Sequence, residues 1–219
     1  LCATRASEAM TDSATRAANG ASRPRDAAHS LLRWIDSGEA TAARGGNASD
    51  ERIDLARILP FVGMHFACLF AFVVGMSPIA ILVAVIAYLV RMFAITAFYH
   101  RYFSHRSFKT SRVGQFIFGV LGAAAVQRGP VWWAAHHRHH HAYSDRSEDS
   151  HSPIVHGFVR SHMGWFLTRK GFAPDLRRVR DLLQFPELRW LDRFDILVPV
   201  ALALGMFGLG ALLEWADPA

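Results

Sequence analysis

The chain has 219 residues, 52% of them hydrophobic, and a formal net charge of +6. Its two cysteines are too few for a disulfide framework, which excludes a small cross-linked secreted domain. Fifteen of the 24 lysines and arginines lie between Arg101 and Arg193, which is one of the segments between apolar stretches. This distribution is typical of membrane topology and of attraction to anionic headgroups, so we do not expect nucleic acid as a partner.

The apolar segments come in chain order after a polar beginning. Residues 1–50 are rich in Ala, Ser, Thr, Arg and Gly and have no apolar period, which predicts a disordered tail. Residues 59–99 carry one formal charge, Arg91, over about twice the ~20 residues that a helix needs to cross a bilayer. Because Ser77-Pro78 near the middle is a turn signal, we predict two spans, over 58–76 and 78–98.

A third span is predicted over 196–215, where Pro199 is tolerated near the start of a membrane helix. Residues 113–126 are apolar but too short to cross a bilayer, and they predict an interfacial or buried helix. Basic residues are absent from the turn between the first two spans and abundant in 99–194. The positive-inside rule therefore places the N-terminus and the 99–194 segment in the cytoplasm. We expect an all-α integral membrane protein, a transmembrane helical bundle with a cytoplasmic helical cap.

Histidines dominate this cap: ten of the twelve lie between His100 and His162. Three of them, His137, His140 and His141, have the spacing i, i+3, i+4, which places them on one face of a helix. Neutral imidazole is the commonest nitrogen ligand of iron, zinc and copper. Crowded imidazoles are otherwise unfavourable, since they repel when protonated and need hydrogen-bond partners when neutral. The pattern predicts metal binding.

A second histidine pair, His100 and His105, follows the second predicted span directly. Residues five apart are separated by about 140° on an ideal α-helix, so this pair shares a face only if the helix ends or unwinds. We expect the helix to end near 102–104 and His105 to come from the following turn. Both histidine groups would then meet at the cytoplasmic mouth of the bundle.

Acidic and aromatic residues flank the histidines. Asp145, Glu148 and Asp149 form either a solvated face or a set of carboxylates that accept the outer N–H of ligating histidines and fix their tautomer. Trp132 and Trp133 are typical of membrane-interface anchors.

The stretches "HRYFSHRSFKTSR" (100–112) and "HHRHHHAYSD…EDSHSP…GFVRSHMGW" (136–165) resemble the first and second histidine boxes of the membrane fatty acyl-CoA desaturases, the stearoyl-CoA desaturase family. The resemblance covers about 59–215 and implies an enzyme that uses O₂ to introduce a cis double bond into a long acyl chain carried by CoA or lipid. "WWAAHH" departs from the lead-in of the animal enzymes, which suggests a bacterial member of the inner membrane. The resemblance implies two non-haem irons, with these ligands in this chain: His100, His105, His137, His140 and His141.

The resemblance also implies partners. Cytoplasmic basic side chains would meet the phosphates of a CoA headgroup, or else extend toward the bilayer interface. The candidates are Arg106, Lys109, Arg112 and Arg128. Because the chain shows neither a dinucleotide-binding fingerprint nor a cysteine cluster, electrons would come from a separate ferredoxin, or from a small cytochrome with its reductase.

The family pattern continues with a fourth span and a third H-x-x-H-H box, neither of which precedes Ala219. We therefore expect residues 51–219 to be a partial, C-terminally truncated desaturase domain. The alternatives are a non-catalytic truncated remnant and a related histidine-box membrane hydroxylase or ketolase. A metal transporter ranks lower, because the first two spans hold only His65 and Arg91 as ionisable groups.

Overall fold

The computed structural model describes residues 34–38, 51–53 and 55–216. Within these residues the fold is helical and has no strand, apart from an isolated antiparallel bridge between Ile53 and Thr168. The first helices in chain order are α4 (Leu55–Cys68), α5 (Ala71–Val74), α6 (Pro78–Phe93) and the π-helix η1 (Ala94–Ser104). They are followed by α7 (Arg112–Ala123), α8 (Pro130–Tyr143), α9 (Pro153–His156), the π-helix η2 (Arg160–Gly164) and the 3₁₀-helix η3 (Trp165–Leu167). The last are α10 (Arg169–Phe172), the 3₁₀-helix η4 (Leu176–Val179), α11 (Arg180–Leu183), α12 (Pro186–Arg193) and α13 (Leu197–Ala216). The predicted all-α class is confirmed.

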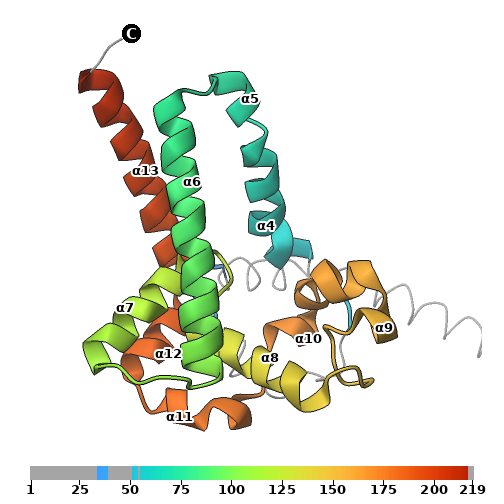
Figure 1. Ribbon diagram of the computed structural model, residues 1–219. Helices are drawn as coiled ribbons and strands as arrows, with labels where there is room; N and C mark the ends of the chain where they lie inside the picture. Colours follow the sequence, from blue (N-terminus) through green and yellow to red (C-terminus); the bar gives the residue numbers. More distant parts are fainter. Residues whose placement is uncertain (1–33, 39–50, 54, 217–219) are drawn as a thin grey trace, which may run out of the picture.

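Three apolar segments stand upright in Figure 1, and the shorter helices α7 to α12 gather at one end of them. Two described helices are long and apolar enough to cross a membrane: Pro78–Ser104, formed by α6 and η1, and Leu197–Ala216. Their large apolar side chains, such as Leu89 and Phe207, are exposed in the isolated chain. Lipid would cover these faces, because contiguous exposed apolar surface of this extent is unfavourable in water.

The first apolar segment differs from the single span predicted over 58–76. It consists of α4 and α5, separated by a turn at Leu69-Phe70. Hydrogen bonds there change to the tighter i→i+3 type, from Leu69 N to Phe66 O (3.0 Å) and from Phe72 N to Leu69 O (3.2 Å). The continuous α-helix is therefore shorter than predicted. We find no residue in the sequence that explains the break.

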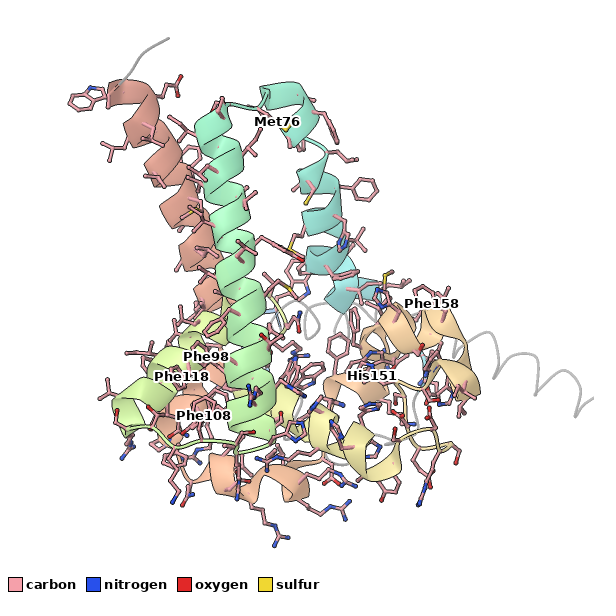
Figure 2. All side chains as sticks on the ribbon, in the orientation of Figure 1. Met76, Phe98, Phe108, Phe118, His151 and Phe158 are labelled. Carbon is pink, nitrogen blue, oxygen red and sulfur yellow. The ribbon has the colours of Figure 1, made fainter. Side chains whose placement is uncertain are left out.

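The turn into α6 has clear local causes. Gly75 adopts a φ of +85°, a conformation that glycine accepts without steric cost. The Ser77 hydroxyl accepts a hydrogen bond from Ala80 N (3.1 Å), and Pro78 occupies the first helical turn. α6 thus begins at the residue where the sequence predicts the second span to begin. Met76 lies in this turn, at the end remote from the histidines (Figure 2).

Of the predicted tail, residues 1–33 and 39–50 lie outside the described residues. Residues 34–38 pack against the end of α12. Ser37 is buried, its N–H donates to Arg193 O (2.7 Å) and its hydroxyl donates to Asp195 (3.1 Å). Asp36 forms a two-pronged ion pair with Arg193. This part of the chain is therefore held by the helical cap.

The core lies where η1 crosses α7 and α8. Tyr99 and Phe103 of η1 are completely buried there, in a cluster that also contains Leu188 of α12. α7 corresponds to the predicted interfacial or buried helix, and its Gly122 faces Tyr99 of η1. Phe98 of η1 stacks on Phe118 of α7 with ring centroids 3.9 Å apart (Figure 2). This packing fixes the end of the second apolar helix, from which the first histidines project.

Candidate metal centre

The winding of η1 brings the first histidine pair together. His105 N donates to His100 O (3.1 Å), an i→i+5 hydrogen bond, and the Ser104 hydroxyl donates to Tyr99 O (2.9 Å). The i→i+5 hydrogen bonds of a π-helix wind the chain more widely than an α-helix, which turns His105 back toward the side of His100. Their Nε2 atoms lie 3.1 Å apart. The sequence predicts that this pair shares a face only if the helix ends or unwinds. The wider winding of η1 meets that condition.

The second histidine group lies on α8, whose start is held from a distance. Pro130 occupies the first helical turn, and Trp132 N donates to the partly buried Asp192 carboxylate of α12 (2.8 Å). A Cβ at Gly129 would lie 2.4 Å from the Asp192 Cα, so only glycine allows this close approach. Asp192 is remote in sequence from α8, and no local spacing signals this capping role.

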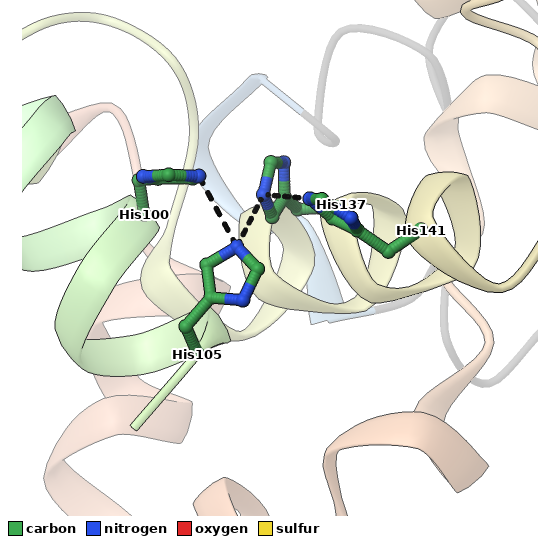
Figure 3. A group of neighbouring side chains, drawn as sticks. All are labelled: His100, His105, His137 and His141. Atoms are coloured by element: carbon green, nitrogen blue, oxygen red, sulfur yellow. Dashed lines mark hydrogen bonds between the residues drawn. The ribbon is translucent and has the colours of Figure 1, made fainter. Parts of the chain in front are cut away.

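Four imidazoles converge from these two helices (Figure 3). The Nε2 atoms of His105 and His137 are 3.2 Å apart, and those of His137 and His141 are 3.0 Å apart. With His100, all four ligand atoms lie within 4.8 Å of one another. Two ligands at right angles on one metal, each about 2.1 Å from it, lie about 3.0 Å apart. The spacing therefore fits ligands of a shared cation.

Hydrogen bonding alone does not satisfy this cluster. The Nε2 atoms of His105 and His137 each face two other ring nitrogens. In a neutral imidazole each ring nitrogen is either a donor with one hydrogen or an acceptor with one lone pair. These contacts cannot all be ordinary two-centre hydrogen bonds. Lone pairs directed at a central cation would satisfy all four rings.

The electrostatics favour neutral rings. Burial lowers the pKa of His137 to about 3, with further lowering from the nearby His100, His141, His105 and His140. Desolvation also lowers the pKa of His105, and the neighbouring His100 and His141 add to the effect. Neutral imidazoles keep the lone pairs that a metal requires.

His140, the remaining predicted ligand, stands apart from the four. Its Nδ1 faces the fully buried Asp149 carboxylate at 2.9 Å. That carboxylate also accepts the N–H groups of Asp145 (3.1 Å) and His151 (3.0 Å). Desolvation acts to raise the pKa of Asp149, but these hydrogen bonds outweigh it and lower that pKa. An ionised Asp149 fixes the Nδ1–H tautomer of His140 and leaves its Nε2 lone pair free.

The other two acidic residues do not contact a predicted ligand. Asp145 accepts from the Ser152 hydroxyl (2.8 Å), and the Glu148 carboxylate accepts from the Ser147 hydroxyl (2.9 Å). The main-chain oxygen of Glu148 lies 3.0 Å from Nε2 of His139, outside the cluster. Of the acidic trio, the structure thus brings only Asp149 to a predicted ligand.

The candidate phosphate contacts are mostly engaged within the chain. The ion pairs are Arg106–Asp181, Arg112–Glu187 and Arg128–Asp195. Lys109 lines a separate cavity of about 370 Å³ with Tyr102 and Phe108. These carboxylates already neutralise part of the positive charge that an incoming phosphate would meet.

A cavity of about 1000 Å³ adjoins the histidines. Residues of α4, including Phe61 and Met64, line one side of the cavity, while His137 and His140 line another.

Two polar ring atoms at this cavity have no hydrogen-bond partner among the described residues. Trp165 and His136 border the cavity, and the Nε1 of Trp165 and the Nε2 of His136 are buried without a partner. Both tryptophans expected at the membrane interface line it too, with Trp132 buried. The histidine cluster thus borders a largely apolar chamber.

Comparisons with known proteins agree with this arrangement. The sequence model of the family described as Fatty acid desaturase matches residues 76–218. The sn-1 stearoyl-lipid 9-desaturase of Anabaena variabilis is 33% identical over 162 residues, which are 73% of this chain and 59% of that protein. Acyl-CoA 5-desaturase AL21 of Anemone leveillei is 35% identical over 169 residues, 74% of this chain and 52% of that protein. Delta-9 acyl-lipid desaturase 1 of Arabidopsis thaliana is 38% identical over 115 residues, 52% of this chain and 37% of that protein.

The chain therefore spans about half the length of the curated relatives it matches. No solved structure matches it.

Proposed function

The chain belongs to the fatty acid desaturase family, and from this premise we propose that it acts in the oxygen-dependent desaturation of a long acyl chain. The observation that carries the proposal is the convergence of four imidazoles beside a largely apolar cavity. Two hydrogens leave adjacent methylenes as a cis double bond forms, and one O₂, two electrons and two protons account for the two waters produced.

We expect the histidines to hold two non-haem irons. His100, His105, His137 and His141 would surround one iron, and the free Nε2 of His140 would serve the other. Bound iron would supply the activation of O₂ that hydrogen removal from an unactivated methylene requires. Nitrogen ligands suit iron and resist oxidation better than thiolates. Electrons would come from a separate ferredoxin or small cytochrome with its reductase.

The chain's own residues would bind and orient the substrate. The cavity walls from α4 and the tryptophans are apolar, so an acyl chain placed there would be shielded from water next to His137 and His140. The names of the relatives include acyl-CoA and acyl-lipid desaturases. The phosphates of a CoA carrier would meet Arg106, Arg112 or Arg128 beside the carboxylates that these residues already pair with.

The proposal places the chain in a lipid bilayer, with 51–219 as a partial desaturase domain and spans over 58–76, 78–98 and 196–215. The N-terminus and the 99–194 segment would face the cytoplasm of a bacterial cell, because basic residues concentrate in that segment. The two long apolar helices support membrane association.

The test is expression of the chain in a host whose own acyl desaturase is deleted, followed by mass spectrometry of fatty acid methyl esters and iron analysis of the purified chain. We expect new cis-monounsaturated acids and bound iron, both lost in H137A and retained in H156A, which changes an exposed histidine of α9. Hydroxy acids in place of alkenes would indicate the hydroxylase alternative. A chain with neither product nor iron would contradict the proposal and favour the non-catalytic alternative.

A further inference from the structure

Arg138, the one residue that interrupts the histidine run at 136–141, has an unusually complete set of partners. A guanidinium group has five N–H donors. Nε donates to Ser104 O (3.0 Å), Nη1 to Arg178 O and Asp181 Oδ1 (both 2.7 Å), and Nη2 to Phe103 O (2.6 Å) and Asp181 Oδ2 (3.0 Å). Five hydrogen bonds thus match five donors, and the side chain is only 18% exposed.

Two of these acceptors are main-chain oxygens directly before His105. Phe103 and Ser104 are the last residues of η1, and His105 follows directly. Carbonyl groups in the last turn of a helix have no partner within the helix and need one from elsewhere. Arg138 supplies it, and Arg138 itself follows His137 on α8. One side chain therefore connects the main chain just before His105 to the main chain just after His137.

Asp181 of α11 keeps the guanidinium in this orientation. Both of its oxygens accept from Arg138, and it also pairs with Arg106, the residue that follows His105. The residues next to His105 and His137 in sequence are thus joined by hydrogen bonds, while the two imidazoles themselves lie 3.2 Å apart. A lysine would not reproduce this, since an ammonium has three donors and lacks the planar fork.

We propose that Arg138 is a positioning residue for the metal centre, an inference that rests on the proposed function. It holds the end of the π-helix against α8, so that the nitrogens of the two histidine boxes converge before a metal binds. It does not touch the metal or the substrate.

A purely structural ion pair would behave differently. Loss of a partly buried pair lowers the free energy of unfolding but leaves the metal affinity of the folded chain unchanged. A positioning role predicts weaker metal binding by a chain that is still folded. Removing groups that orient metal ligands typically lowers affinity about 10–100-fold.

The experiment uses the full chain in detergent micelles, with Co²⁺ as the probe. Co²⁺ affinity is measured from the visible absorption of the complex, helix content by circular dichroism, and hydrogen exchange by mass spectrometry for peptides that cover 100–107. The variants are R138A and R138K. The matched control is R177K. Arg177 is an exposed residue of the neighbouring η4, and its guanidinium forms a two-pronged ion pair with Asp175 that the substitution weakens.

We expect R138K to bind Co²⁺ about tenfold or more weakly, with faster exchange in 100–107 and wild-type helix content. R177K should match the wild type. If R138A does not fold, R138K decides the matter. Wild-type affinity in R138K would overturn the inference, as would an unfolded R138K, since Arg138 would then be needed for folding rather than for geometry. If the wild-type chain itself binds no Co²⁺, the metal site of the proposed function fails instead.

Discussion

Gly122 of α7 provides a sharp test of the packing that positions His100. A Cβ at Gly122 would lie 2.0 Å from Cε1 and 2.2 Å from Cδ1 of Tyr99, closer than the 3.0 Å below which real Cβ contacts essentially never occur. The Tyr99 ring is fully buried, and its hydroxyl donates to Arg128 O (3.1 Å). G122A therefore forces the ring, the helix or both to move.

The magnitude follows from two opposing effects. Overpacking a well-filled core costs about 1–3 kcal/mol, and the hydroxyl bond of Tyr99 limits how far its ring can turn, which places G122A toward the upper end. Better helix propensity of alanine offsets this by up to about 1 kcal/mol. The net loss of about 2 kcal/mol in the free energy of unfolding corresponds to a Tm lower by about 4–8 °C. Because Tyr99 precedes His100, we also expect weaker Co²⁺ binding.

The assay is thermal unfolding in detergent followed by circular dichroism. G205A and G208A in α13 are matched controls, because nothing lies within 4 Å of a Cβ at either position. Both should keep or raise the Tm. In a Y99A background the space is vacated, so G122A should cost less there than in the wild type. A Tm for G122A at or above that of the wild-type chain would refute the reasoning.

Three further predictions concern the charged and ligating groups. Burial raises the pKa of Asp192 from 3.8 to about 7. The protonated form therefore stabilises the folded chain fully below pH 4, and this stabilisation is lost as pH rises through 7. D192N keeps an acceptor for Trp132 N, so thermal unfolding should show wild type losing about 2 kcal/mol relative to D192N between pH 5 and 8; parallel curves would contradict this. H137A should lower Co²⁺ affinity by more than about 100-fold in an absorption titration, against no change in H156A. D149N should lower iron retention about 10-fold by weakening the bond to His140, and iron analysis at wild-type levels would exclude that role.

The fold was predictable where local signals are strong. A long stretch with one charge, a Ser-Pro turn and a third apolar run predict upright apolar helices, and α6 does begin at Pro78. The break at Leu69-Phe70 was not predictable, since no glycine or proline marks it. Capping of α8 by Asp192 depends on how α12 packs, which the sequence of α8 does not contain.

The site shows the same division. The i, i+4 spacing of His137 and His141 places both near one another on α8, and they do meet at 3.0 Å. His140, at i+3 from His137, does not join this pair, and its ring contacts Asp149 instead. The α-helical rule keeps His100 and His105 apart, and only the π-winding of η1 reconciles them. Residues of η1 also make tertiary contacts that a local spacing does not contain, from Tyr99 to Arg128 O and from Arg138 to Phe103 O.

The need for these supports follows from the chemistry of the cluster. The contacts among the four ring nitrogens cannot all be ordinary hydrogen bonds, so the imidazoles themselves do not favour their own approach. Contacts outside the cluster hold the two helices that carry it, from Asp192 at the start of α8 and from Arg138 near its middle. Asp149, beyond the end of α8, orients His140, which stands apart from the four. Asp192 and Asp149 accept main-chain N–H groups, and Arg138 donates to main-chain oxygens and to the Asp181 carboxylate. In the proposed function the histidines would supply the affinity for metal, and the surrounding scaffold would supply the geometry of the site.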